Sequence, residues 1–79
     1  MRFVNVGYGN VVSMQRIVAI VSPESAPVRR LVQDGRDERK VIDATCGRKT
    51  RAVIITDTGL LILSPLQTET LAARMEDMK

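Results

Sequence analysis

A short basic segment, Gly47–Arg51, carries the residues in this sequence that are best suited to bind an anion. Its first residue is a glycine, which adopts a positive φ at little cost and so permits a sharp reversal of the chain. The reversal would leave Arg48 and Lys49 at an exposed tip, with Arg51 just inside the following strand. Guanidinium groups match the geometry of phosphate, and Thr50 can add a neutral hydrogen bond. The segment therefore predicts contact with a phosphate backbone.

The distribution of charge supports this reading more than the total does. Twelve basic and nine acidic residues give a net charge of +3, which is a mild excess. No acidic residue lies between Asp43 and Asp57, so the basic segment is a local concentration of positive charge. In Arg29–Lys40, by contrast, five basic residues alternate with three acidic ones and the field largely cancels. Arg16, next to an apolar strand, either belongs to the same basic surface or is simply solvated.

Residues for catalysis or metal binding are scarce. The chain has no histidine, so the usual proton shuttle near neutral pH is missing and a zinc site has almost no ligands. Asp43 and Asp57 flank the basic segment, but aspartates at strand ends usually form Asx turns. The single cysteine, Cys46, has basic neighbours that could activate its thiol, although a buried, inert cysteine is the preferred interpretation. We expect no catalytic residue, cofactor, metal site or small-molecule substrate.

A second glycine-containing segment, Gly7-Tyr8-Gly9-Asn10, has the G-x-G spacing found in some phosphate-binding loops. A third glycine is absent, and a strand rather than a helix is expected to follow. An ordinary tight connection is therefore the preferred interpretation, with Tyr8 at its tip and available to stack on a partner.

The elements that must position these residues are short strands and two helices, in the order β-β-α-β-β-β-α. The first helix should run from Ala26 to about Arg39, with Ser25 as its N-cap and Pro27 in its first turn. Gly35 inside this helix either frays it or allows a close contact. The second helix should begin at a capping box, Ser64 with Gln67, or at Thr68, and reach about Met78. Five strands are predicted, with a brief extended piece at Val11–Met14: Phe3–Val6, Arg16–Ser22, Val41–Thr45, Thr50/Arg51–Thr56 and Leu60–Leu63.

These elements predict a single α+β domain over residues 1–79, with a small mixed or antiparallel sheet of four to five strands. Val41–Thr45 and Ala52–Ile55 are expected to pair as a β-hairpin across the basic segment. The single unpaired cysteine, together with the lack of a signal peptide or a long apolar run, indicates a soluble cytoplasmic protein that does not enter a membrane.

Assembly from several copies is expected for two reasons. A chain of 79 residues buries only about 60% of its unfolded surface, and no intramolecular disulfide is available to compensate. Three strands, Ile17–Val21, Ala52–Ile55 and Leu60–Leu63, are apolar on both faces, whereas two short helices can cover only one face of a sheet. The other face would then be an apolar patch of the kind that forms subunit contacts. The alternative is that the sheet curls and covers itself.

The sequence resembles the RemA family of bacterial extracellular-matrix regulators. The resemblance runs in order from Phe3 to at least Thr70. It is carried by four segments: Phe3–Asn10, Val21–Pro27, Ile42–Thr45 and Gly47–Val53.

The resemblance implies a DNA-binding transcriptional regulator of biofilm-matrix genes that assembles into homo-oligomeric rings, octameric where best known. It also implies DNA contacts at Arg16, Arg48 and Lys49, to which the basic segment adds Arg51. The family more often has arginine where Lys49 stands, and an aromatic residue where Cys46 stands. A lysine replaces a bidentate contact by a point charge, so affinity and sequence preference can differ from those of the family.

Three hypotheses follow from these observations. The leading one is an oligomeric regulator that binds duplex DNA mainly through backbone and shape contacts, since no recognition helix with a set of base-reading side chains is visible. The second is an oligomeric scaffold or adaptor that holds an acidic protein partner through the same basic turn. The third is a thiol-based enzyme acting through Cys46.

Overall fold

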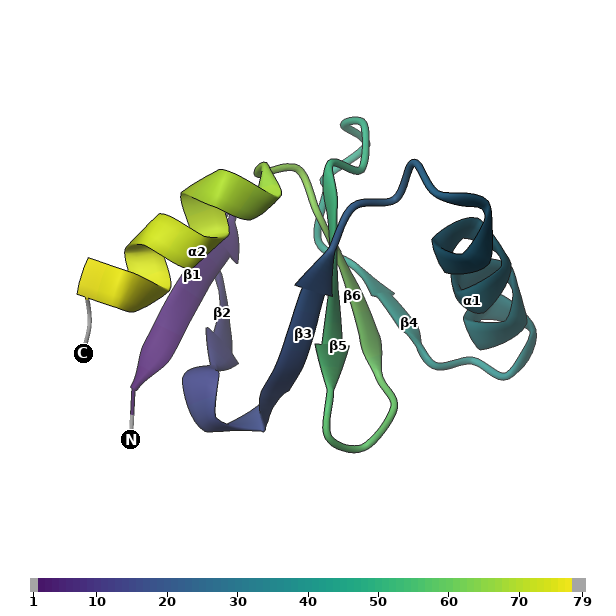
Figure 1. Ribbon diagram of the computed structural model, residues 1–79, viewed down its shortest axis with the longest axis horizontal. Helices are drawn as coiled ribbons and strands as arrows, with labels where there is room; N and C mark the ends of the chain where they lie inside the picture. The colour runs from purple at the N-terminus through teal and green to yellow at the C-terminus, as the bar shows by residue number, and fades with distance from the viewer. Residues whose placement is uncertain (1, 78–79) are drawn as a thin grey trace.

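The computed structural model describes residues 2–77, which form six strands, one short 3-10 helix and two α-helices (Figure 1). Their order confirms the predicted α+β class, and the extended piece predicted near Val11 is a strand. The predicted end of the second helix at Met78 lies outside the described residues. No helix in the described part of the chain is long and apolar enough to cross a membrane. In chain order the elements are β1 (Phe3–Gly7), β2 (Asn10–Ser13), η1 (Met14–Arg16), β3 (Ile17–Val21), α1 (Ala26–Asp37), β4 (Val41–Asp43), β5 (Ala52–Thr56), β6 (Leu61–Ser64) and α2 (Thr68–Asp77).

The strands form two sheets. β1 and β2 pair as an antiparallel hairpin, and the other four form a mixed sheet in the order β3-β5-β6-β4. The predicted hairpin of β4 with β5 is wrong, because β6 lies between them and pairs with β4 in parallel and with β5 antiparallel. Two physical features favour this arrangement. The connection from β5 to β6 is a tight turn, which favours pairing of those neighbours. All four residues of β6 are also buried, as suits a central strand.

Both faces of the two central strands are covered. On one face, Val53, Leu61 and Leu63 form a cluster against which side chains of α1 pack. On the other face, Ile54 and Ile62 share a core with residues of β1 and with Leu71 of α2. The expectation that one whole face lies open is therefore wrong, because the N-terminal hairpin together with α2 covers the face that α1 leaves free.

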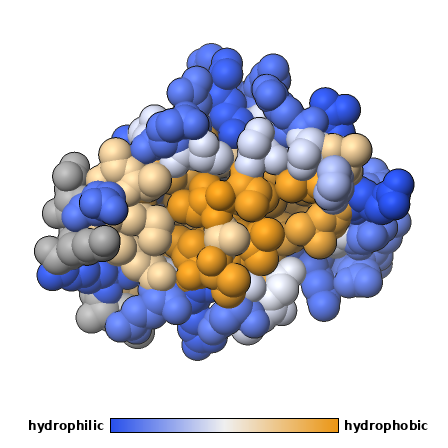
Figure 2. Space-filling model, in the orientation of Figure 1, coloured by the Kyte–Doolittle hydropathy of each residue, from blue (hydrophilic) through white to orange (hydrophobic). Residues whose placement is uncertain are grey.

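The edge strand β3 is only partly covered. None of its five apolar residues is fully buried, and the side chain of Val18 is 68% exposed at a point where the pairing register with β5 shifts. Figure 2 shows the resulting apolar surface, which lies between the two helices and has a polar rim. Ala72 and Met75 of α2 extend this surface beyond Ile17–Ile20 of β3. This apolar surface is thus formed by an edge strand with its surroundings rather than by a whole sheet face.

Three local predictions are tested by contacts in the structure. Gly35 is buried in α1, and a Cβ at this position would lie 2.8 Å from Leu61 Cδ1 and 3.1 Å from Val41 Cγ2, so the glycine permits a close contact and the helix does not fray there. Ser64 does not cap α2. Its buried hydroxyl donates to the Val6 carbonyl at 2.7 Å and so ties β6 to β1, and α2 begins at Thr68. The predicted cap at Ser25 is confirmed.

Candidate functional site

The basic segment belongs to a loop, residues 44–51, that crosses the end of β6. At its start the Ala44 amide donates to the Leu63 carbonyl at 2.9 Å, and at its end the Arg51 amide donates to the Ser64 carbonyl at 2.9 Å. The loop takes this route because β4 and β5 lie on opposite sides of β6. It projects beyond the sheet at the end where α2 begins, at the top of Figure 1. We refer to residues 44–51 as the basic loop.

Hydrogen bonds at the start of the basic loop fix its shape. One oxygen of Asp43 accepts from the amide of Thr45 at 2.9 Å and from its hydroxyl at 2.5 Å. These two bonds hold the pKa of the Asp43 carboxyl below its ordinary value. The Arg48 amide then donates to the Thr45 carbonyl at 3.0 Å, and Gly47 adopts the positive φ of 81° that its residue type allows. The expectation of an Asx turn at Asp43 is therefore confirmed.

The environment of Cys46 differs from the prediction. The residue is exposed on the basic loop with a positive φ of 55°, so the expected buried position is wrong. Burial was expected because the residue follows a strand. The turn begins at Thr45, however, and it is Thr45 that is buried instead.

The structure brings three of the four predicted contact residues together. Arg48, Lys49 and Arg51 are exposed and line a hollow of about 630 Å³. A fourth cation in the lining is a residue that the sequence did not indicate, Arg74 of α2, whose Nη1 donates to the Asn5 carbonyl at 2.9 Å. No acidic residue lines this hollow within the described part of the chain, so its field is positive. The full lining is Asn5, Gly7, Tyr8, Arg48, Lys49, Arg51, Pro65, Leu66 and Arg74.

A smaller hollow of about 220 Å³ adjoins the basic loop and has a different character. Lys49 and Arg51 line it as well, but Glu24 and Glu69 also contribute to its wall. The mixed charge makes this hollow a poor site for an anion. The lining of the larger hollow contains four cationic residues and no carboxylate, and it is the better candidate for an anion site.

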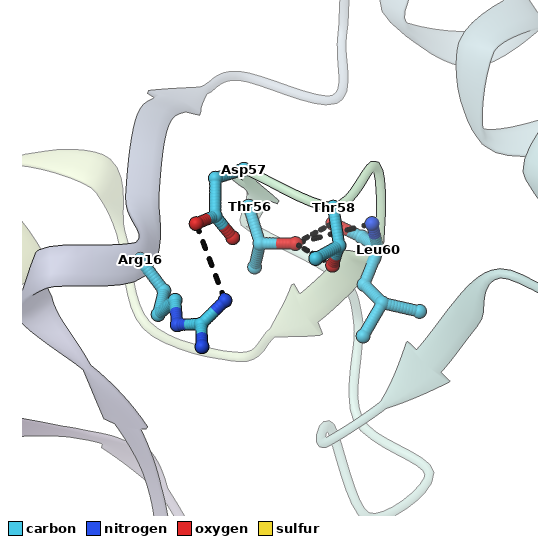
Figure 3. A network of polar contacts seen from close by, with 5 residues as sticks. All are labelled: Arg16, Thr56, Asp57, Thr58 and Leu60. Atoms are coloured by element: carbon cyan, nitrogen blue, oxygen red, sulfur yellow. Dashed lines mark hydrogen bonds and ion pairs between the residues drawn. The ribbon is translucent and has the colours of Figure 1, made fainter.

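The structure places Arg16, the fourth predicted residue, at the other end of the sheet. Because β3 and β5 run antiparallel, Arg16 before β3 lies beside Asp57 after β5, while the basic loop precedes β5. Its Nη1 lies 3.3 Å from Asp57 Oδ2 in an exposed ion pair (Figure 3). The Asp57 amide also donates to the Arg16 carbonyl at 2.9 Å. Within one chain, Arg16 is therefore not part of the surface formed by the basic loop.

The glycine-containing segment is the expected tight connection. It joins β1 to β2, which pair antiparallel on either side of it. The Asn5 side chain accepts from the Gly7 amide at 2.8 Å, and the Asn10 amide group donates to the Gly7 carbonyl at 2.9 Å. Gly7 and Tyr8 nevertheless line the larger hollow, so the turn contributes to the candidate site through its position beside the basic loop.

The fold and this site define a small α+β protein that presents a shaped cationic surface. A family model described as "RemA-like: Extracellular matrix regulatory protein A-like" matches residues 3–75. The chain belongs to the RemA-like family.

Relatives from three bacilli support this assignment. Proteins from Bacillus cytotoxicus, Bacillus mycoides and Bacillus cereus are each 60% identical over 77 residues, which covers 98% of this chain and 88% of the relative. All three carry the name "Putative regulatory protein". The family description and these names agree on a regulatory role and indicate no enzymatic one.

Proposed function

We propose that this protein is a transcriptional regulator that binds duplex DNA through the basic loop, and that it does so as a homo-oligomeric ring. The observation that carries the proposal is the grouping of Arg48, Lys49 and Arg51 on one exposed surface, around a hollow of about 630 Å³ with no acidic lining residue. Phosphate contacts from such a surface set position and affinity, and the shape of the duplex adds selectivity. The regulated genes are those of the extracellular matrix, in keeping with the name of the family.

An assembly that repeats the basic loop would bind DNA more tightly than one subunit does. A few cationic contacts per subunit correspond to weak non-specific binding, on the order of 10⁻⁴–10⁻⁶ M at physiological salt. Linking several such surfaces raises the overall affinity by about 10²–10⁴ without any new contact, provided that they can engage the DNA together.

The exposed edges of the main sheet support a closed ring. A ring requires two different surfaces on each subunit that fit one another head to tail. The strand order puts β3 and β4 at opposite edges, and each carries an exposed apolar side chain, Val18 at 68% and Ile42 at 50% exposure. An eight-membered ring follows from the family resemblance alone.

Arg16 lies at the other end of the sheet from the basic loop. It contacts DNA only if the assembly or the path of the duplex joins the two ends of the sheet, because one subunit keeps Arg16 and the basic loop apart. A neighbouring subunit that sets its Arg16 beside the next basic loop would meet this condition.

The experiment that tests the DNA contact combines a binding titration with a mass measurement. R48A/K49A should abolish binding of duplex DNA at physiological salt, while light scattering gives the same mass as the wild type. R29A/R30A on α1 removes the same charge from another surface, and it should bind DNA within about twofold of the wild type.

The steepness of the salt dependence provides the second readout. The logarithm of the wild-type affinity should fall linearly with the logarithm of the salt concentration. Binding by R48A/K49A with an unchanged slope would show that the loop is not the contact. If the wild type binds no DNA but captures an acidic protein through the same residues, the protein is an adaptor.

A further inference from the structure

The hollow beside the basic loop is lined by three separate parts of the chain: the N-terminal hairpin, the basic loop, and α2 with the connection that precedes it. Three of its cations come from the loop, and the fourth, Arg74, comes from α2. Its volume of about 630 Å³ lies within the range of roughly 300–1,000 Å³ typical of sites for small ligands. Loop charges on a convex surface would enclose no such space. The arrangement is therefore a half-open depression lined by cations rather than a convex patch of surface charge.

Arg74 is oriented before any ligand arrives. Its bond to the Asn5 carbonyl at 2.9 Å uses one of the five N–H donors of the guanidinium group and leaves the others available. The helix that carries it is packed on the core through the fully buried Leu71. A side chain held in this way loses less conformational entropy on binding, which favours affinity.

Apart from Asn5 and Gly7, the rest of the lining is apolar or aromatic. Tyr8 is 56% exposed on the β1–β2 turn, and Pro65 and Leu66 lie on the connection from β6 to α2. A bare inorganic anion would leave these groups without contacts. A phosphate with an attached sugar would use both the cations and the apolar wall.

We propose that this hollow binds one phosphate group together with its sugar, and that Arg74 of α2 binds the phosphate together with the cations of the basic loop. The phosphate is one of the DNA backbone, so the inference rests on the proposed function. A free nucleotide presents the same chemistry and is distinguished by the test. Because Arg74 belongs to a helix anchored in the core, it positions the bound phosphate relative to the whole fold rather than to the loop alone.

Three variants with equal net charge test the hollow. Asn5→Asp places a carboxylate in the lining and keeps the acceptor that the Gly7 amide uses at 2.8 Å. Arg74→Gln removes the guanidinium group, and Arg30→Gln, on α1, is the matched control. We expect N5D and R74Q each to weaken binding of a short fluorescent DNA duplex about tenfold, since each disturbs one charge-assisted contact. R74Q should lower the salt slope by about one, and R30Q should change neither quantity.

Circular dichroism and light scattering on each variant separate loss of the site from loss of the fold. If R74Q unfolds because the bond from α2 to β1 is missing, N5D decides the question, as it retains the local hydrogen bond. Equal DNA affinity of a folded N5D and R30Q would overturn the proposal, and so would equal affinity of a folded R74Q and R30Q. Either result concerns the hollow alone. The proposed function still stands if R48A/K49A does not bind duplex DNA while the wild type does.

A second arm identifies the source of the phosphate. dTMP and inorganic pyrophosphate are titrated into the wild type and the same variants, with and without DNA. If dTMP binds, and binding depends on Asn5 and Arg74, the hollow also accepts a free nucleotide. If only the duplex shows this dependence, the backbone is the ligand. Should the wild type bind no DNA, the proposed function fails. In that case, binding of dTMP to the wild type but not to N5D or R74Q supports the hollow as a phosphate site. If the wild type does not bind dTMP either, the proposal of a phosphate site is overturned.

Discussion

At the scale of single residues, whether an arginine is available to bind a phosphate depends more on its neighbours in the fold than on its position in the sequence. Arg16 faces a carboxylate at 3.3 Å, whereas the three cations of the basic loop line a hollow without an acid. An exposed ion pair contributes only about 0–1 kcal/mol, so the Arg16–Asp57 pair can open when a phosphate competes for the guanidinium group. The pair therefore weakens a DNA contact at Arg16 without preventing it.

Replacing Asp57 tests whether Arg16 contacts DNA. D57N frees the guanidinium group and raises the net charge by one, so we expect DNA affinity to rise about threefold. Asp34→Asn on α1 makes the same change in charge on another surface, and R16A should lower affinity. Fluorescence anisotropy with labelled duplex measures all three. Equal gains in D57N and D34N would place Arg16 outside the DNA surface.

At the scale of elements, α1 packs closely on the sheet because one residue lacks a side chain. Gly35 costs about 1 kcal/mol of helix propensity relative to alanine, yet it lies where Leu61 and Val41 approach the helix axis. Leu61 is only 3% exposed, so its side chain has little room to move. The contact between α1 and the sheet thus depends on a residue that is unfavourable within the helix itself.

Gly35→Ala should lower the free energy of unfolding by about 1 kcal/mol. Alanine improves the helix propensity by about 1 kcal/mol relative to glycine. The overlap of its methyl group with Leu61 and Val41 costs more, about 1–3 kcal/mol. Urea denaturation at equal protein concentration measures the change, and Arg30→Ala on the exposed face of the same helix should stay within about 0.5 kcal/mol of the wild type. A more stable G35A would show that the neighbouring side chains relax freely.

The sequence predicts the elements well because their signals are local. The cap at Ser25, the apolar strands and the Asx turn at Asp43 all depend on residues a few positions apart. The strand partners depend on non-local packing, and the insertion of β6 between β4 and β5 could not be read from the turn between them. Arg74 was missed for the same reason, since it reaches the basic loop only through the packing of α2 on β1.

At the scale of the whole molecule, the two edges of the main sheet differ in length and direction. β3 has five residues and pairs antiparallel with its neighbour, whereas β4 has three and pairs in parallel. Surfaces that differ in this way suit head-to-tail contacts between copies, which close into a ring when the rotation allows it.

Mixing two interface variants tests this geometry. V18E and I42E should each yield monomers in light scattering, because a charge at one edge blocks one half of every contact. An equimolar mixture should yield a dimer, since each variant keeps the edge that the other has lost. If I42E keeps the wild-type mass while V18E is monomeric, the contact is symmetric through β3 and no head-to-tail ring forms.

The place of β6 in the strand order also affects how the chain folds. Among the described strands, β4 pairs only with β6, which is the last strand to be synthesised. A nascent chain that ends before Leu61 can join β3 to β5, but it has no neighbour for β4 and only part of the surface on which α1 packs. Completion of the main sheet therefore requires β6 to take its place between β4 and β5. Since the basic loop crosses the end of β6, its conformation is completed only at this step.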